Sequence, residues 1–440
     1  MSGAPRAPAE QTVVMKFGGS SVADAVRIKR AAARIVRAAE HGSRVVAVLS
    51  ARGRTTDELT AMAQEVSDAP HPRELDMLLS TGERISCALA AMVINDLGHE
   101  VISLTGSQAG IVTDTSHTKA RILDVRTDRI SAALDAGRIV LVAGFQGVST
   151  ESDVTTLGRG GSDTTAVALA AALGGEVCEI YTDVAGVFSA DPRIVSDARK
   201  LALVSFEEML EMAASGAGVL QLRAVEYARN HGLPIHCRSS FEDAPGTFVV
   251  GEETTLERPL ITAITHSTDE ARITLTGLPD RPGIAGRVLT VLAGANVNVD
   301  MIIQNEPQSE GRDADMSFTV PRSDLNAARD ALTPLKDELG IGAVATDERM
   351  GKVSIVGAGM RSHPGVAART FSVLGEAGVN IEMISTSPIK ISCVIHEDQV
   401  EDAVRGLHAA FELGEDAVRR EDPRGDHRPT VVPSAEAEAG

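Results

Sequence analysis

Aromatic residues are scarce in this chain of 440 residues, which has nine Phe, two Tyr and no Trp. The hydrophobic content of 43% is nevertheless ordinary for a globular protein, so a core must be built from Ala, Val, Leu and Ile. Such a core suits helices packed on a buried sheet. Because the chain is too long for one ordinary domain core, we expect two or three domains.

Positive charge is also in short supply, since 42 Lys and Arg stand against 61 Asp and Glu, a formal net charge of −19. Nucleic acids and anionic membranes are bound by basic surfaces, so neither is an expected partner. No apolar run approaches the roughly 18 residues that span a bilayer, and the N-terminal segment lacks the apolar core of a signal peptide. We therefore expect a cytoplasmic protein.

The four cysteines are scattered among apolar neighbours without CxxC spacing, at Cys87, Cys178, Cys237 and Cys393. This pattern predicts buried thiols, with neither a disulfide nor a metal site. No metal ligand is assigned to the protein.

Apolar strands alternate with helical patterns along the first half of the chain. A strand at 12–17 ends in Gly-Gly-Ser-Ser, and helical spacing follows it as far as Ala39. This alternation predicts an α/β sandwich with a mainly parallel sheet. Further strands are expected at 44–50, 100–104, 138–143, 177–183 and 233–240, and further helices near 74–97, 162–173 and 206–230.

An internal repeat organises the rest of the chain, because residues 272–302 resemble residues 353–384. Pro282-Gly283 recurs as Pro364-Gly365, an offset of 82 residues (364 against 282), and Asn298 and Met301 recur at the same offset. Each copy, with helices at 324–338 and 397–410, has the pattern of a ferredoxin-like βαββαβ module.

These patterns divide the chain into domains and tails. We assign residues 12–247 to the α/β domain, 262–342 to the first module and 350–412 to the second. The segments 1–11 and 414–440 are poor in apolar residues, so we expect disordered tails.

The glycine turn at Lys16-Phe-Gly-Gly-Ser-Ser21 joins a strand to a helix. Glycines there let backbone N–H groups approach phosphate oxygens, and Lys16 would add a positive charge. The sequence is not a Walker A loop, in which the Lys follows the glycines. A tight turn with a solvated lysine explains the same residues equally well.

A second glycine loop, Gly158-Arg-Gly-Gly-Ser-Asp163, opens a predicted helix. Arg159 can hold a carboxylate in bidentate fashion, and Asp163 can orient Lys16. Simple helix capping would account for Ser162 and Asp163 but not for Arg159 or the glycines.

Several motifs together resemble the aspartokinase family. They are KFGGSS at 16–21, TTDEL at 55–59, LLSTGERIS at 78–86, TGSQAG at 105–110, AGFQGV at 143–148, TTLGRGGSDTTA at 155–166 and YTDVAGVFSADPR at 181–193. The tandem repeat resembles the two ACT domains that follow the kinase domain in this family, and the version from actinobacteria that lysine and threonine inhibit jointly is the most similar. The resemblance covers residues 12–412 and implies an amino-acid-kinase three-layer sandwich.

The resemblance implies transfer of the γ-phosphoryl of ATP, with Mg²⁺, to L-aspartate, the first step of lysine, threonine and methionine biosynthesis. It assigns phosphate stabilisation to Lys16, the substrate amino group to Glu83, the substrate α-carboxylate to Arg159, and the orientation of Lys16 to Asp163. The other implied substrate residues are Thr56, Gly160, Gly161 and Ser162. The other implied nucleotide residues are Phe17, Gly18, Gly19, Ser20, Thr182, Asp183, Phe188, Asp191 and Arg193.

The resemblance also implies that threonine and lysine bind between ACT domains of a homo-oligomer and inhibit the kinase. A separately made ACT-only subunit is left open as a further partner. The expected effector residues are Asp280, Ile284, Ala285, Asn298, Gln304 and Asn305 in the first module, and His363, Val379, Asn380, Ile381 and Thr386 in the second. The residues themselves favour such a site, since the helix after Pro-Gly offers free N–H groups and the Asn offers amide donors and acceptors. Simple turns at Pro-Gly and Asn are the alternative.

Three places depart from the family pattern, one of them Ser50-Ala-Arg-Gly-Arg54, where arginines stand in place of Met and a polar or acidic residue. Gly218 stands where the family commonly has a lysine that reaches ATP, and Arg223 is a candidate to replace its charge. Pro388 replaces a glutamate that could receive a lysine ammonium. Two alternative functions stay open. One is another amino-acid kinase of the same fold that acts on glutamate or acetylglutamate, and the other, motivated by Gly218, is a non-catalytic amino-acid sensor.

Overall fold

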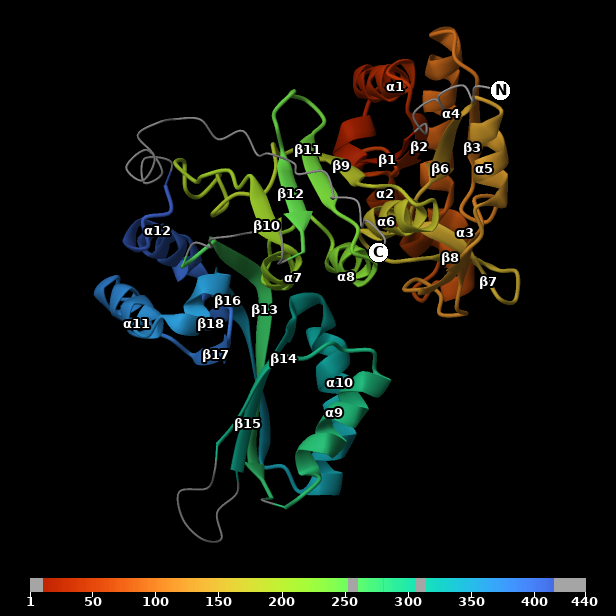
Figure 1. Ribbon diagram of the computed structural model, residues 1–440. Helices are drawn as coiled ribbons and strands as arrows, with labels where there is room; N and C mark the ends of the chain where they lie inside the picture. The colour runs from red at the N-terminus through yellow and green to blue at the C-terminus, as the bar shows by residue number, and fades with distance from the viewer. Residues whose placement is uncertain (1–10, 252–259, 280, 306–313, 415–440) are drawn as a thin grey trace, which may run out of the picture.

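The computed structural model describes residues 11–251, 260–279, 281–305 and 314–414 (Figure 1). Of the two segments predicted to be disordered tails, residues 1–10 and 415–440 lie outside the described residues. The remaining residue of each segment, Gln11 and Gly414, is part of the described structure. Gln11 accepts a hydrogen bond from the backbone of Arg44, and Gly414 forms a β-bridge with Ala198. The expectation of disorder is therefore wrong for Gln11 and Gly414, because each pairs with backbone distant in the sequence.

The N-terminal half is built on an eight-stranded sheet in the order β10-β12-β11-β9-β1-β2-β6-β3. Every neighbouring pair is parallel except β11 and β12. The predicted mainly parallel sheet is confirmed. Its strands are β1 (Thr12–Phe17), β2 (Arg44–Leu49), β3 (Val101–Leu104), β6 (Ile139–Ala143), β9 (Cys178–Thr182), β10 (Leu203–Ser205), β11 (Ile235–Ser239) and β12 (Thr247–Val250).

Helices cover both faces of this sheet. Alternate residues of β1 enter different cores, Val14 on one face and Met15 and Phe17 on the other, as the period of a strand requires. The first core includes α5 (Asp128–Asp135), α6 (Gly161–Ala172), α7 (Phe206–Ala214) and α8 (Leu222–His231). The second includes α1 (Ala25–Glu40) and α4 (Thr81–Asp96), which gives the predicted three layers. All four cysteines are buried free thiols.

Two predicted long helices are each divided in two. The segment predicted at 74–97 is α3 (Pro72–Leu79) followed by α4, and the segment at 206–230 is α7 followed by α8. Gly216 lies between α7 and α8 at φ +104°, where a Cβ would come 1.9 Å from the carbonyl oxygen of His266. Residue 216 must therefore be glycine, and its left-handed conformation ends α7.

Some short elements escaped prediction because they are brief and partly polar. Helix α2 (Thr55–Val66) follows β2, and a second sheet has the order β5-β4-β7-β8. Its strands are β4 (Ile111–Thr113), β5 (Ile122–Val125), β7 (Gln146–Ser149) and β8 (Val154–Thr156).

One described segment, Pro72–Asp96, is long and apolar enough to cross a membrane by length and composition alone. The expectation that no segment approaches this length is therefore wrong. Within it, Cys87, Ala90 and Ile94 of α4 pack into the core beneath β1, β2 and β6. The apolar character of the segment is that of a core helix.

The C-terminal half has a six-stranded antiparallel sheet in the order β14-β15-β13-β16-β18-β17. Helices α9 and α11 both begin after a glycine with positive φ, Gly283 at +96° and Gly365 at +103°, so the repeat is structural as well as sequential. The strands are β13 (Ala263–Leu278), β14 (Asp300–Asn305), β15 (Ala314–Pro321), β16 (Ala343–Val356), β17 (Met383–Ser387) and β18 (Lys390–His396). The helices are α9 (Ile284–Gly294), α10 (Leu325–Leu339), α11 (Val366–Glu376) and α12 (Val400–Ala410).

The two repeat units share their long central strands, and Figure 1 shows β13 running from the second unit into the first. Residues 263–267 of β13 pair with residues 352–356 of β16, so they supply the fourth strand of the second unit. The assigned boundary at residue 262 places this segment in the first module instead. The sequence repeat could not reveal this, because the repeat begins near Arg272 and so does not include residues 263–267.

Candidate active site

Two glycine-containing loops meet beside the middle of the parallel sheet. Lys16 lies near the carboxyl end of β1, and its Nζ is 2.5 Å from Oδ1 of Asp163 in the first turn of α6. The two side chains are 12% and 8% exposed. In such low exposure an ion pair is weakly screened, so Asp163 fixes the position of the ammonium group.

The turn after β1 has no room for a side chain at Gly19. The Gly18 N–H donates to the carbonyl of Tyr181 at 3.2 Å, and a Cβ on Gly19 would lie 2.8 Å from the carbonyl oxygen of Ala51. Residues Gly19–Val22 then form a short 3₁₀ helix, the segment in which Ser20 lies. Backbone thus lies close enough at this turn to line a small anionic ligand.

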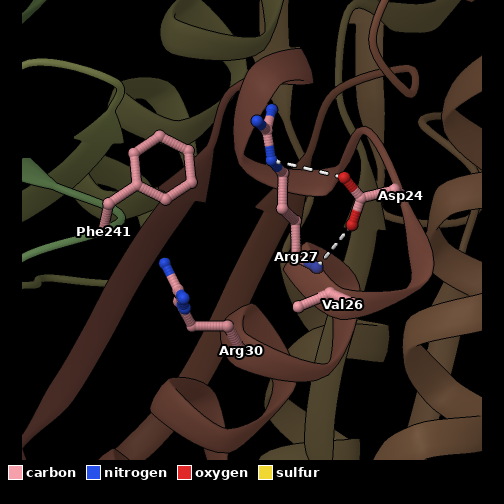
Figure 2. A pocket seen from close by; sticks show the side chains of 5 residues that line it. All are labelled: Asp24, Val26, Arg27, Arg30 and Phe241. Carbon is pink, nitrogen blue, oxygen red and sulfur yellow. Dashed lines mark hydrogen bonds and ion pairs between the residues drawn. The ribbon is translucent and has the colours of Figure 1, made fainter.

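A hollow of about 340 Å³ is lined by residues at the start of α1 and by Phe241. Figure 2 shows the side chains that line it. Arg27 of α1 donates to the carbonyl of Ser20 at 2.9 Å and lies over the ring of Phe241 at 5.2 Å. Arg30 lies over the same ring at 5.7 Å. Arg27 thus ties the glycine turn to α1.

Glu83 is a buried carboxylate at the start of α4 and is 3% exposed. Its Oε1 accepts the backbone N–H of Ala51 at 3.1 Å, while its Oε2 has no hydrogen-bond partner in the described part of the chain. Burial raises its pKa to about 7. The close approach of α4 depends on Gly82, where a Cβ would lie 2.8 Å from the Cβ of Ala51. An unsatisfied buried carboxylate oxygen is costly, so it is a functional candidate.

The loop before α6 presents an arginine to solvent. Gly160 is the N-cap of α6 at φ +72°, while Gly161 and Ser162 are buried in its first turn. The Arg159 side chain is 95% exposed, with Nη2 3.4 Å from Oδ1 of Asp57 on α2. Thr56 precedes Asp57 and is half-buried. An ion pair this exposed is weak, so Arg159 is available to a ligand.

The expected nucleotide residues fall into two groups. Thr182 is the last residue of β9 and follows Tyr181, whose carbonyl accepts the Gly18 N–H. The Thr182 hydroxyl donates to Asp183 at 3.0 Å. Further along, Arg193 forms an ion pair with Asp191 at 2.6 Å, which lowers the pKa of Asp191. Phe188 packs against the core of the second repeat unit. This second group therefore lies where the two halves of the molecule meet.

Arg223 does not replace the missing charge at Gly218. Its guanidinium donates to the carbonyls of Leu157 at 2.7 Å and Ala120 at 3.0 Å, so it holds loop backbone. A Cβ on Gly218 would meet no atom of the described residues within 4 Å.

Asp76 is a fully buried carboxylate that sequence reasoning missed. It accepts hydrogen bonds from the His117 ring, from the Thr118 backbone and from the Thr156 hydroxyl. The available signal was an Asp among the apolar residues Leu75, Met77, Leu78 and Leu79 at the end of α3. Asp76 ties α3 to β8, and so supports the region that leads into the arginine loop.

A hollow of about 420 Å³ lies in the second repeat unit. Two expected effector residues, His363 and Thr386, line it together with Gly365, Val366 and Pro388. Val379 is buried in the core of this unit and does not line the hollow. The side chain of Asn380 donates to Glu382 at 2.8 Å. Ile381 is half-buried and packs against the core of this unit.

The corresponding residues of the first unit are more scattered. Ile284 and Ala285 pack against the core of that unit at the start of α9. Asn298, Gln304 and Asn305 are exposed. Asp280 lies outside the described residues.

Helix α7 joins the kinase-like half to the hollow of the second unit. Oε1 of Glu208 accepts hydrogen bonds from the Thr262 hydroxyl at 2.7 Å and the Ala358 N–H at 3.1 Å. One turn later Glu211 lies 2.8 Å from Nζ of Lys390 and accepts from the Ser387 hydroxyl at 3.5 Å. Because Ser387 also lines the hollow, a ligand bound there would lie next to a residue that contacts α7 directly.

Comparison with known families agrees with this arrangement. The Amino acid kinase family profile matches residues 11–239, and ACT domain profiles match residues 272–337 and 353–411. Fold and site thus define an amino acid kinase with two ACT domains. An aspartokinase of Mycobacterium tuberculosis is 56% identical over 407 residues, which is 92% of this chain and 97% of the relative. An aspartokinase of Corynebacterium glutamicum is 52% identical over 405 residues, which is 91% of this chain and 96% of the relative. The chain belongs to the aspartokinase family of enzymes.

Two crystal structures of E. coli aspartokinase III resemble most of the chain. The complex with aspartate and ADP, in the R-state, has a TM-score of 0.79 at 26% identity and covers 91% of this chain and 99% of the other. The complex with lysine and aspartate, in the T-state, has a TM-score of 0.69 at 27% identity with the same coverage. The arrangement of this chain is therefore more similar to that of the R-state.

Proposed function

We propose that the protein transfers the γ-phosphoryl group of ATP to the β-carboxylate of L-aspartate, giving 4-phospho-L-aspartate. The observation that carries this proposal is the convergence of the two glycine loops at the Lys16–Asp163 ion pair, with Glu83 and Arg159 on the elements around it. The structural relative that binds aspartate and ADP supports the choice of ligands. The reaction would begin lysine, threonine and methionine biosynthesis in the cytosol.

Phosphoryl transfer depends mainly on positioning and on positive charge near the phosphoryl oxygens. Lys16 supplies that charge, and Asp163 keeps its ammonium in place. The attacking carboxylate of aspartate is already ionised at neutral pH, so no general base is needed. Arg159 holds the α-carboxylate of the substrate, and Glu83 receives its ammonium group.

The remaining expected ligand residues complete the two halves of the site. Thr56 and the donors at Gly160, Gly161 and Ser162 border the aspartate. The glycine turn at Phe17, Gly18, Gly19 and Ser20 faces the phosphates. The segment carrying Thr182, Asp183, Phe188, Asp191 and Arg193 holds the rest of the nucleotide.

Magnesium fits this site only as a companion of ATP. Among the described residues there is no group of three or more His, Cys, Asp or Glu that could hold a metal ion, and Asp163 is engaged by Lys16. Phosphate oxygens and water would therefore supply most of the ligands. When bound, Mg²⁺ neutralises phosphate charge.

Threonine and lysine are proposed as inhibitors that bind the ACT domains of a homo-oligomer. The hollow lined by His363, Thr386 and Pro388 supports this proposal, as does the lysine complex of the E. coli relative. Inhibition requires that the effectors bind an inactive arrangement more tightly than the active one.

Release of ADP, coupled to an indicator reaction, tests the proposal with aspartate, glutamate and acetylglutamate as separate substrates. We expect turnover with aspartate alone and its reduction by threonine, lysine or both. Turnover only with another acidic substrate would favour a different amino-acid kinase. No turnover at high ATP would favour an amino-acid sensor.

A further inference from the structure

Gln221 contacts the arginine loop at two residues to which the proposed function gives roles. Its backbone N–H donates to Oδ2 of Asp163 at 3.3 Å, and its side-chain Nε2 donates to the carbonyl of Arg159 at 2.9 Å. Gln221 is the N-cap of α8, yet its side chain makes no capping hydrogen bond to that helix. Its amide is directed to the loop instead.

The loop backbone lies directly on this side chain. A Cβ on Gly160 would come 2.6 Å from Cγ of Gln221, so only glycine fits at this crossing. Two residues further along, Arg223 donates to the carbonyl of Leu157. The start of α8 therefore holds the loop on both sides of Gly158.

Arg159 itself has little else to fix it. Its side chain is 95% exposed and has one ion pair, at 3.4 Å, with Asp57. The position of the Arg159 backbone therefore determines where its guanidinium can reach a ligand. Gln221 fixes that backbone through the hydrogen bond to its carbonyl. Small displacements of a substrate-positioning group weaken binding strongly.

We propose that Gln221 is a positioning residue for the substrate α-carboxylate, acting through the backbone of Arg159. This inference rests on the proposed function, since it takes Arg159 as the group that binds aspartate. The side-chain amide affects aspartate binding, while the backbone N–H to Asp163 survives any substitution except proline.

The test compares purified full-length variants. Gln221→Met keeps the reach of the side chain without its donor, and Gln221→Lys restores a donor. Leu222→Ala is the matched control, because Leu222 is the 38% exposed neighbour on α8. For Gln221→Met we expect the KM for aspartate to rise about 3- to 10-fold, the effect of one lost hydrogen bond, with kcat and the KM for ATP within about twofold. Gln221→Lys should recover most of the KM, and Leu222→Ala should match the wild type.

Hydrogen–deuterium exchange gives a readout independent of activity. Backbone amides of residues 158–163 should exchange faster in Gln221→Met than in the wild type or Leu222→Ala. An unchanged KM for aspartate together with unchanged exchange would overturn the inference. So would a parallel loss in kcat and both KM values with a lowered melting temperature, which is the signature of a packing defect. A wild type inactive with aspartate would instead refute the proposed function, and the exchange measurement would still test the contact.

Discussion

The buried carboxylate of Glu83 predicts an enzyme that becomes more stable when this group is neutralised. Burial raises the Glu83 pKa from an ordinary 4.5 to about 7. Between these values the folded state holds a proton that the unfolded state has lost. Stability therefore falls as the pH rises through this window, and the full penalty is present above about pH 7.

The size of this penalty follows from the pKa values. At 1.36 kcal/mol per pKa unit, the rise corresponds to about 3 kcal/mol. Glu83→Gln keeps an oxygen for the Ala51 N–H but carries no charge. The variant has no such penalty. The difference in free energy of unfolding between the variant and the wild type should therefore grow by about 2–3 kcal/mol from pH 5 to pH 8, in favour of the variant.

Urea unfolding of the two proteins at several pH values measures this difference. The same variant should raise the KM for aspartate more than about tenfold, because the amide no longer attracts the substrate ammonium. Asp76→Asn is the matched control, since a buried carboxylate with several hydrogen bonds should lose stability on neutralisation. A stability difference between Glu83→Gln and the wild type that stays flat from pH 5 to pH 8 would refute the reasoning.

Three further substitutions test the nucleotide site and the regulation. Gly218→Lys has open space for a side chain, and it should lower the KM for ATP about 3- to 10-fold in steady-state kinetics; a rise would show that the added charge points elsewhere. Glu211→Gln removes the charge facing Lys390 and should raise the threonine or lysine concentration for half-inhibition at least about threefold, with uninhibited kcat unchanged. Pro388→Glu places a carboxylate at the hollow of the second unit, so lysine should inhibit at roughly tenfold lower concentration, and unchanged lysine titrations would exclude this position as the ammonium site.

Local patterns were sufficient to predict the parts of the fold that depend on periodicity. The strand at 12–17 and the helix after Gly160 agree closely with β1 and α6, because alternation and glycine placement are local signals. The break at Gly216 was missed, although a glycine within a helical pattern is itself a breaking signal. The close approach of His266, which is far along the chain, could not be predicted from local patterns.

The shared strand between the repeat units shows the same limit. The 82-residue offset identifies two similar units, yet the fourth strand of the second unit comes from residues 263–267, ahead of the first. Strand exchange of this kind leaves no mark in local spacing, since it depends on pairing between β13 and β16.

The candidate site shows a similar division. Lys16 and Asp163 were foreseeable partners, because each sits in a distinctive glycine loop. Gln221 and Asp76 were not, since an ordinary polar residue becomes informative only when its partners are known. Their hydrogen bonds join segments about 60 to 80 residues apart in the sequence.

The central claim is that Lys16 supplies the positive charge for phosphoryl transfer to aspartate. Its most direct test traps the acyl phosphate product with hydroxylamine and compares Lys16→Met with Lys29→Met, which changes an exposed lysine of α1. We predict that product formation falls at least about 100-fold in Lys16→Met and is unchanged in Lys29→Met. Product formation by Lys16→Met within threefold of the wild type would contradict the account.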